Sequence, residues 1–181
     1  LEFLNLNSSN ALLKSLEEPN DNVVFFLINN SEYKILETVR SRCIEYKALL
    51  SINEIKSIVN QYFNENKYDN IPKDFICYYN SPSFLISLIN YFDENNINIK
   101  NVTINSFFYY FINNKHYLKN TFIIENLSFF IELFFYNNIN NTNRISFKIK
   151  DYFYKKFFEI KKYNLDLETF FLEFDDRLLG E

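Results

Sequence analysis

The residue with the clearest capacity for chemistry is Arg42, which stands between Ser41 and Cys43. A guanidinium stays charged at physiological pH, and its planar fork matches the oxygens of a phosphate. When such a group reaches a transferring phosphoryl group from outside, it accelerates the reaction by roughly 10³ to 10⁵. The alternative is an ordinary surface arginine at the end of a helix, where the helix dipole favours a cation. The tripeptide alone does not distinguish the two roles. The tripeptide alone is a weak signal, so the elements around it decide its meaning.

Other catalytic groups are scarce. His116 is the only histidine, which argues against a histidine-based metal site or a Ser-His-Asp triad; we expect it at a helix surface or cap. Cys43 and Cys77 form neither a CxxC pair nor a disulfide framework, which favours a reduced, cytoplasmic setting. We expect Cys43 to pack as a small apolar group. Glu17 and Glu18 are neighbours and therefore point to different sides of a helix, which indicates a solvated helix end.

The composition excludes several function classes. The chain has 181 residues, 48% of them hydrophobic, and a single glycine, Gly180. A Walker A or dinucleotide loop needs glycines so that backbone amides can approach phosphates, so no phosphate cradle or cofactor site is expected in this chain. A net charge of -4 does not fit a stand-alone nucleic-acid binder. No apolar run reaches the ~18 residues of a membrane span. Because the chain starts at Leu1 without a cap, we expect an N-terminally truncated fragment.

The first 50 residues read as an α/β layer. Leucines at residues 12–16 predict a helix, which ends before Pro19. The apolar run Val23–Ile28 does not alternate and predicts a strand buried on both faces. A short helix over Lys34–Arg40 and a strand over Ile44–Leu49 are expected to follow.

The remaining residues read as helical. Ser51 and Glu54 form a capping box that starts a new region. The expected boundary at residues 93–100 is polar, and residues 137–143 read as a loop. Four lysines, at residues 155, 156, 161 and 162, are interleaved with Phe153, Phe157, Phe158 and Ile160. This pattern is typical of an amphipathic helix and, as a weaker alternative, of a DNA-facing surface. The predicted helices cover residues 51–63, a segment beginning at Pro72, and residues 83–92, 103–113, 116–136, 145–163 and 167–178, the last capped by Asp166.

The order of three segments resembles the second half of the AAA+ core of sliding-clamp loaders. These segments are NALLKSLEEP (Asn10–Pro19), the run VVFFLI, and KILETVRSRC (Lys34–Cys43). Within that family the chain is most similar to the delta-prime type of bacterial DNA polymerase III. The resemblance implies that Arg42, within the motif Ser41-Arg42-Cys43, is an arginine finger. It would act in trans on ATP bound by the neighbouring subunit.

Two further positions follow from this resemblance. Asn30 falls at the sensor-1 position, after the predicted strand; the alternative is a strand-ending asparagine that satisfies its own backbone. Ser81-Pro82-Ser83 begins the predicted lid helix without the arginine that active clamp-loader ATPases usually carry there. An uncharged lid cannot neutralise a triphosphate, which favours the delta-prime type, a subunit that does not hydrolyse ATP.

The expected fold class is mixed and mostly α. Residues 1–50 would be the C-terminal part of an AAA+ α/β core, residues 51–98 a helical lid, and residues 99–181 a helical collar for oligomerisation. The resemblance implies a stator subunit that helps to load the sliding clamp onto primed DNA. Its partners would be gamma/tau and delta subunits, with the clamp and primer-template DNA reached through the complex. The alternatives are an ATP-hydrolysing gamma/tau-type motor subunit and a non-enzymatic helical interaction module.

Overall fold

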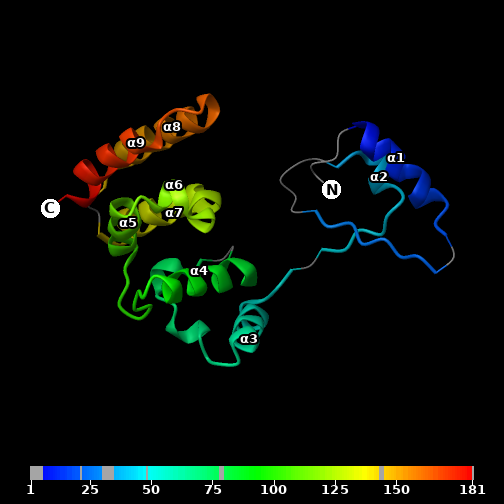
Figure 1. Ribbon diagram of the computed structural model, residues 1–181, viewed down its shortest axis with the longest axis horizontal. Helices are drawn as coiled ribbons and strands as arrows, with labels where there is room; N and C mark the ends of the chain where they lie inside the picture. The colour runs from blue at the N-terminus through cyan, green and yellow to red at the C-terminus, as the bar shows by residue number, and fades with distance from the viewer. Residues whose placement is uncertain are drawn as a thin grey trace. The chain divides into compact units, whose positions relative to one another are not determined.

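The computed structural model is mostly α-helical, and Figure 1 shows its course. Contacts divide the chain into two units, Leu1–Leu49 and Leu50–Glu181. The structure describes residues 6–20, 22–29, 35–47, 49–77, 80–142 and 145–180.

In the described part of the N-terminal unit, two helices contact each other, α1 (Leu6–Glu17) and α2 (Glu37–Arg40). Helix α1 ends at Glu17, directly before Glu18 and Pro19. The proline predicts this end, because the residue before a proline is disfavoured in helical geometry. Helix α2 begins after Leu36 and is a single turn. Its Val39 is buried, and the chain leaves the helix through Ser41.

The two predicted strands are wrong for the described residues. Residues 23–29 and 44–47 run without strand pairing, and their apolar side chains are largely exposed, 87% for Phe26 and 99% for Ile44. A strand exists only where a neighbouring strand accepts and donates the backbone hydrogen bonds. No described segment of this unit does so, and the α/β layer is therefore absent from the part of the chain that the structure describes.

The second unit begins as the capping box predicts. Helix α3 (Ile52–Phe63) follows Ser51, whose hydroxyl accepts the Glu54 backbone N–H at 3.4 Å while the Glu54 carboxylate accepts the Ser51 backbone N–H at 2.7 Å. The Ser51 hydroxyl also donates to the Glu54 carboxylate at 2.7 Å, and this bond, followed by the one from the Ser51 backbone N–H, lowers the pKa of Glu54. Helix α3 ends at Asn64 in a left-handed conformation, with φ of 54°.

Two turns of 3₁₀ helix connect α3 to α4, at Tyr68–Asn70 and Lys73–Phe75. The full helix expected after Pro72 is therefore shortened to one turn. The buried Asn80 explains this, because its side-chain amide donates to the Phe75 carbonyl at 2.6 Å and closes the segment into a loop. Helix α4 (Pro82–Glu94) then starts at Ser81, whose hydroxyl accepts the Phe84 N–H.

The later helices differ from expectation at two points. The predicted helix 116–136 is divided at Asn120, whose side chain accepts the Ile123 N–H at 3.1 Å and starts a new helix. The predicted loop 137–143 is wrong up to residue 142, because the helix continues to Thr142. The bounds are α5 (Ile104–Asn113), α6 (His116–Lys119), α7 (Thr121–Thr142), α8 (Phe147–Tyr163) and α9 (Leu167–Phe174), followed by a π-helical turn (Asp175–Leu179).

One aromatic core joins these helices, which succeed one another from α3 to α9 in Figure 1. Phe107 in α5 is fully buried and contacts Phe75 and Phe92 edge-on, with ring centroids 5.4 and 5.8 Å apart. On the other side, Phe108 stacks on Phe174 at 5.2 Å. The core therefore continues across residues 93–100, where the lid was expected to give way to the collar. That division rests on the resemblance and stays a prediction.

Candidate functional site

Arg42 lies directly after α2 and is held by the turn that it follows. Its Nη1 donates to the Thr38 carbonyl at 2.8 Å and lies 3.4 Å from the Ser41 hydroxyl. The Ser41 hydroxyl itself donates to the same Thr38 carbonyl at 3.2 Å. The side chain of Arg42 remains 35% exposed, so the guanidinium is fixed at the protein surface rather than enclosed.

The other edge of the guanidinium meets a carboxylate that is distant in sequence. The Nε of Arg42 donates to Oε1 of Glu17 at 2.6 Å, and Nη2 forms an ion pair with the same oxygen. Glu17 is the last residue of α1. The ion pair therefore joins the end of α1 to the end of α2 and uses the first glutamate of the segment NALLKSLEEP. Sequence reasoning treated Glu17 as a solvated helix end and missed this contact.

Arg40, the last residue of α2, provides a comparison two residues before Arg42. It pairs with Glu45 through Nε at 3.0 Å and Nη2 at 2.8 Å, and its side chain is 55% exposed. This pairing raises the pKa of Arg40. Glu45 lies only five residues away, so the Arg40 contact is local, whereas the Arg42 contact spans 25 residues. Both arginines are thus paired surface groups, and only the Arg42 pair connects two helices.

Cys43 is half-buried at the wall of an open cavity of about 760 Å³. The cavity lies within the N-terminal unit, and its wall combines Val39 with apolar side chains of the two unpaired segments, such as Phe26 and Tyr46. Among its described residues the wall also carries Arg40 and Lys47. Cys43 is half-buried beside Val39 and these apolar side chains, which is the environment of a small packing residue.

The sensor-1 position, Asn30, lies outside the described residues. Its neighbour Asn29 lines the cavity, and the Oδ1 of Asn29 is buried and has no hydrogen-bond partner among the described residues. A buried amide oxygen without a donor costs free energy. Asn29 is therefore as good a candidate as Asn30 for a polar contact with a ligand. The sequence offers two adjacent asparagines and no signal that separates them.

His116 takes no part in this site. Its Nδ1 lies 2.6 Å from the Tyr91 hydroxyl, and its ring packs edge-on against Tyr91 and Tyr110. Burial, and secondarily the charge of Lys119, lowers the pKa of His116. Burial raises the pKa of Tyr91, so the hydroxyl keeps its proton; the tautomer of the neutral imidazole sets which of the two groups donates the hydrogen bond. This is a structural pair between α4 and α6.

The start of the predicted lid helix carries no cation. A cavity of about 380 Å³ lies where Ser81 and Ser83 of α4 meet Thr121 and Glu125 of α7. Glu125 is the only charged side chain among the described residues of its wall. The sequence lacks an arginine at the start of the predicted lid helix. Helix α7 does not supply a cation in its place, because Glu125 is a carboxylate and would repel a phosphate.

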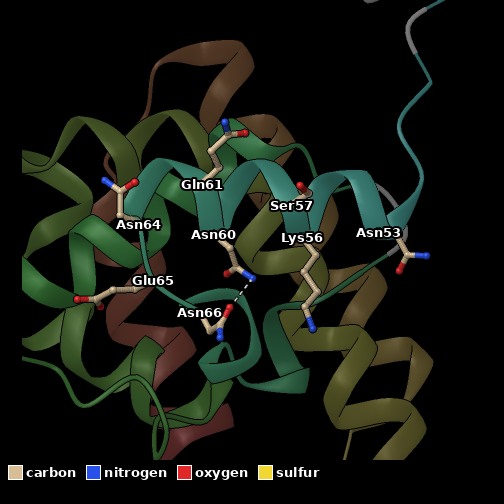
Figure 2. A pocket seen from close by; sticks show the side chains of 8 residues that line it. All are labelled: Asn53, Lys56, Ser57, Asn60, Gln61, Asn64, Glu65 and Asn66. Atoms are coloured by element: carbon tan, nitrogen blue, oxygen red, sulfur yellow. Dashed lines mark hydrogen bonds between the residues drawn. The ribbon is translucent and has the colours of Figure 1, made fainter.

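A further hollow of about 780 Å³ lies along α3, and Figure 2 shows the polar side chains that fan out around it. Three of the lining residues, Lys56, Asn60 and Asn66, have side-chain partners. Asn60 donates to the Asn66 side chain at 3.4 Å, the dashed line in Figure 2, and Lys56 pairs with Asp69 at 2.6 Å. The hollow is therefore a polar surface whose described lining residues are mostly exposed.

Two other kinds of site are absent from the part of the chain that the structure describes. No cluster of three His, Cys, Asp or Glu side chains among these residues is arranged to hold a metal ion. No described helix combines the length and apolar character needed to cross a membrane.

A match to a known protein family covers the segment that contains Arg42. Residues 1–55 match the family model described as DNA polymerase III, delta subunit. The DNA polymerase III subunit gamma of Buchnera aphidicola (subsp. Schizaphis graminum) is 33% identical over 111 residues, which cover 57% of this chain and 31% of that protein. The subunit delta' of Pseudomonas aeruginosa is 48% identical over 44 residues, or 24% of this chain and 13% of that protein. No solved structure matches the chain.

These matches support membership of the family of clamp-loader subunits of DNA polymerase III. Within that family the relatives include both gamma and delta' subunits; the delta' subunit of the same Buchnera is 45% identical over 62 residues, 34% of this chain and 18% of that protein. The chain spans less than a third of the length of each of these relatives.

Proposed function

We propose that the chain acts as the delta-prime type stator of a DNA polymerase III clamp loader and that Arg42 supplies an arginine finger in trans. The observation that carries the proposal is the position of Arg42, which lies at the surface, at the end of a short helix, in the segment that matches the family. A fixed guanidinium at a subunit boundary would stabilise the charge that develops on the γ-phosphate of a neighbour's ATP.

This proposal assigns the chemistry to a neighbouring subunit. The chain would bind no nucleotide through its own residues and would not be an ATPase by itself. It would assemble with gamma/tau and delta subunits in the cytoplasm, and the complex would place the sliding clamp on primer-template DNA. The acidic cavity at the start of α4 supports a subunit that does not hold a triphosphate under this helix.

The Arg42→Ala variant tests the finger. In a reconstituted clamp loader, we expect single-turnover ATP hydrolysis at the site next to this subunit to slow at least tenfold, since a finger contributes roughly 10³ to 10⁵. Arg40→Ala is the matched control, because it removes the same charge two residues away, at the last residue of α2, and this variant should hydrolyse ATP at the wild-type rate. Equal rates for the two variants would refute the finger.

A gamma/tau-type motor subunit is the second candidate, because the gamma relative aligns over 57% of the chain. Such a subunit would hold ATP in a glycine-rich loop, which this sequence with its single glycine does not contain. Equilibrium ATP binding by the complete protein separates the two candidates. Binding would favour the motor type, and its absence the stator.

The helical interaction module with a chance resemblance to the family is the least supported candidate. Six curated proteins match significantly, and all those named are DNA polymerase III subunits. A pull-down with gamma/tau and delta subunits tests this candidate. Association with these subunits is expected for the stator, and a lack of association for the unrelated interaction module.

A further inference from the structure

We infer that Glu17 is a positioning residue for Arg42, a role that rests on the proposed arginine finger and adds a second residue to it. The geometry points to this role because one carboxylate oxygen receives the Nε of Arg42 and pairs with its Nη2, while the Thr38 carbonyl receives Nη1. All three nitrogens of the guanidinium are thus oriented by the protein.

Fixing an arginine matters because its side chain is long. A free arginine samples many rotamers, and each turnover would have to order it at the moment of reaction. The contacts to Glu17 and Thr38 hold it in one arrangement beforehand, while about a third of the side chain stays accessible. Preorganised charge of this kind contributes to the transition state without a reorganisation cost.

The location of Glu17 supports the same role. It is the last residue of α1, whose chain is then redirected by Pro19, and α1 contacts α2. The carboxylate is 49% exposed, so it is not required to neutralise a buried charge. Its neighbour Glu18 has the same charge and is also exposed, and the described residues show no side-chain partner for it. Glu18 is therefore a matched control for the loss of a carboxylate.

The test compares Glu17→Ala, Glu18→Ala and Arg42→Ala in the reconstituted clamp loader, measuring kcat and KM for DNA-stimulated ATP hydrolysis. We expect Glu17→Ala to lower kcat three- to fivefold with KM changed by less than twofold. Fivefold corresponds to about 1 kcal/mol, the upper end for a partly exposed ion pair. Glu18→Ala should match wild type. In the Arg42→Ala background, Glu17→Ala should have no further effect.

A second readout does not depend on activity. In the 181-residue chain labelled with ¹⁵N-arginine, the Nε–H of Arg42 should exchange with water at least threefold faster in Glu17→Ala than in wild type or Glu18→Ala. Glu17→Gln, which keeps an acceptor, should restore part of the protection.

The outcomes separate the two proposals. If Arg42→Ala slows hydrolysis but Glu17→Ala behaves as Glu18→Ala does, only the positioning role is overturned. If Glu17→Ala still slows hydrolysis in the Arg42→Ala background, Glu17 acts through another group and the role is again overturned. If Arg42→Ala has no effect, the finger itself fails, and exchange at Nε then reports a purely structural pair.

Discussion

At the scale of single residues, pairing decides what each polar group can do. Arg42 and Glu17 form a surface pair that leaves the guanidinium accessible. His116 and Tyr91 form a partly buried pair in which both groups are held neutral, because burial disfavours the imidazolium and the phenolate alike. The first pair suits a group that must contact a ligand, and the second suits a group that holds two helices together.

The His116 pair predicts a pH dependence of stability. Because the folded pKa of His116 lies below its ordinary value near 6.5, the unfolded chain binds the proton more readily. The contribution is fully present above pH ~6.5 and is lost as the pH falls from there towards the folded pKa. We expect the midpoint of thermal unfolding of the chain to fall between pH 7.5 and 5.5, and to fall less in His116→Gln.

Carboxylates with lowered pKa values also make stability depend on pH, but in a lower pH range than His116 does. Glu54, Asp166 and Glu173 accept hydrogen bonds that lower their pKa values, so their contributions are lost only as the pH falls below ~4.5. The loss above pH 5.5 should therefore depend on His116 alone. A His116→Gln variant with the wild-type slope in that interval would contradict the assignment.

At the scale of elements, asparagine has two opposite roles in this chain. Asn64, Asn96 and Asn164 adopt left-handed conformations with φ between 51° and 55°, and Asn64 and Asn164 end α3 and α8. Asparagine tolerates this region better than other side chains, and so serves where glycine usually does. Asn137 and Asn138, by contrast, are buried in the interior of α7.

The buried asparagines explain why α7 does not end where the sequence suggests. The Asn138 amide donates to the Asn105 side chain at 2.9 Å, and Asn105 donates back at 3.3 Å. Asn137 donates to the Asp74 carbonyl, 63 residues away, at 3.0 Å. These partners lie on other elements, so they satisfy polar groups that would otherwise favour a loop.

This network predicts a stability effect for Asn138→Ala. We expect a loss of about 1–3 kcal/mol in the free energy of unfolding, because Asn105 loses its partner at a half-buried position. Asn113→Ala is the control, since Asn113 is exposed at the end of α5, and it should change stability by at most ~0.5 kcal/mol. Urea unfolding followed by circular dichroism measures both. Equal midpoints would show that the amide pair contributes little.

At the scale of the whole molecule, each of the two units has its own character. The unit of residues 50–181 has a continuous core of aromatic rings, with Phe107, Phe108 and Phe174 fully buried. In the unit of residues 1–49, the described apolar segments leave side chains such as Phe26 and Ile44 exposed. The second unit has the burial that a stable domain needs, and the first presents its apolar residues to solvent.

The continuous core predicts that the second unit unfolds as one. Phe107→Ala should destabilise it by about 3–5 kcal/mol, as expected for a buried phenylalanine. Amides in α4 and in α8 should lose hydrogen-exchange protection together, because Phe107 contacts rings on both sides of residues 93–100. Phe158→Ala, at a site 63% exposed, is the control. Loss of protection in α5–α9 with α4 unchanged would indicate that residues 51–98 and 99–181 fold independently.

The sequence by itself determined the features that depend on near neighbours. Capping residues such as Ser51 and Asp166 fixed helix starts, because the hydrogen bonds they make reach only three residues along the chain. The order of the segments up to Cys43 was enough to indicate the clamp-loader family, and the single glycine excluded a phosphate cradle within these residues.

Tertiary structure alone decided the features whose partners are distant. The run Val23–Ile28 has the composition of a buried strand, but a strand requires hydrogen-bond partners that its own residues cannot provide, and none is described beside it. Asn137 remains helical because of a carbonyl 63 residues away. Glu17 is oriented towards Arg42 only because α1 and α2 meet. In each case the outcome depends on whether residues distant in the sequence provide a contact, which local sequence does not encode.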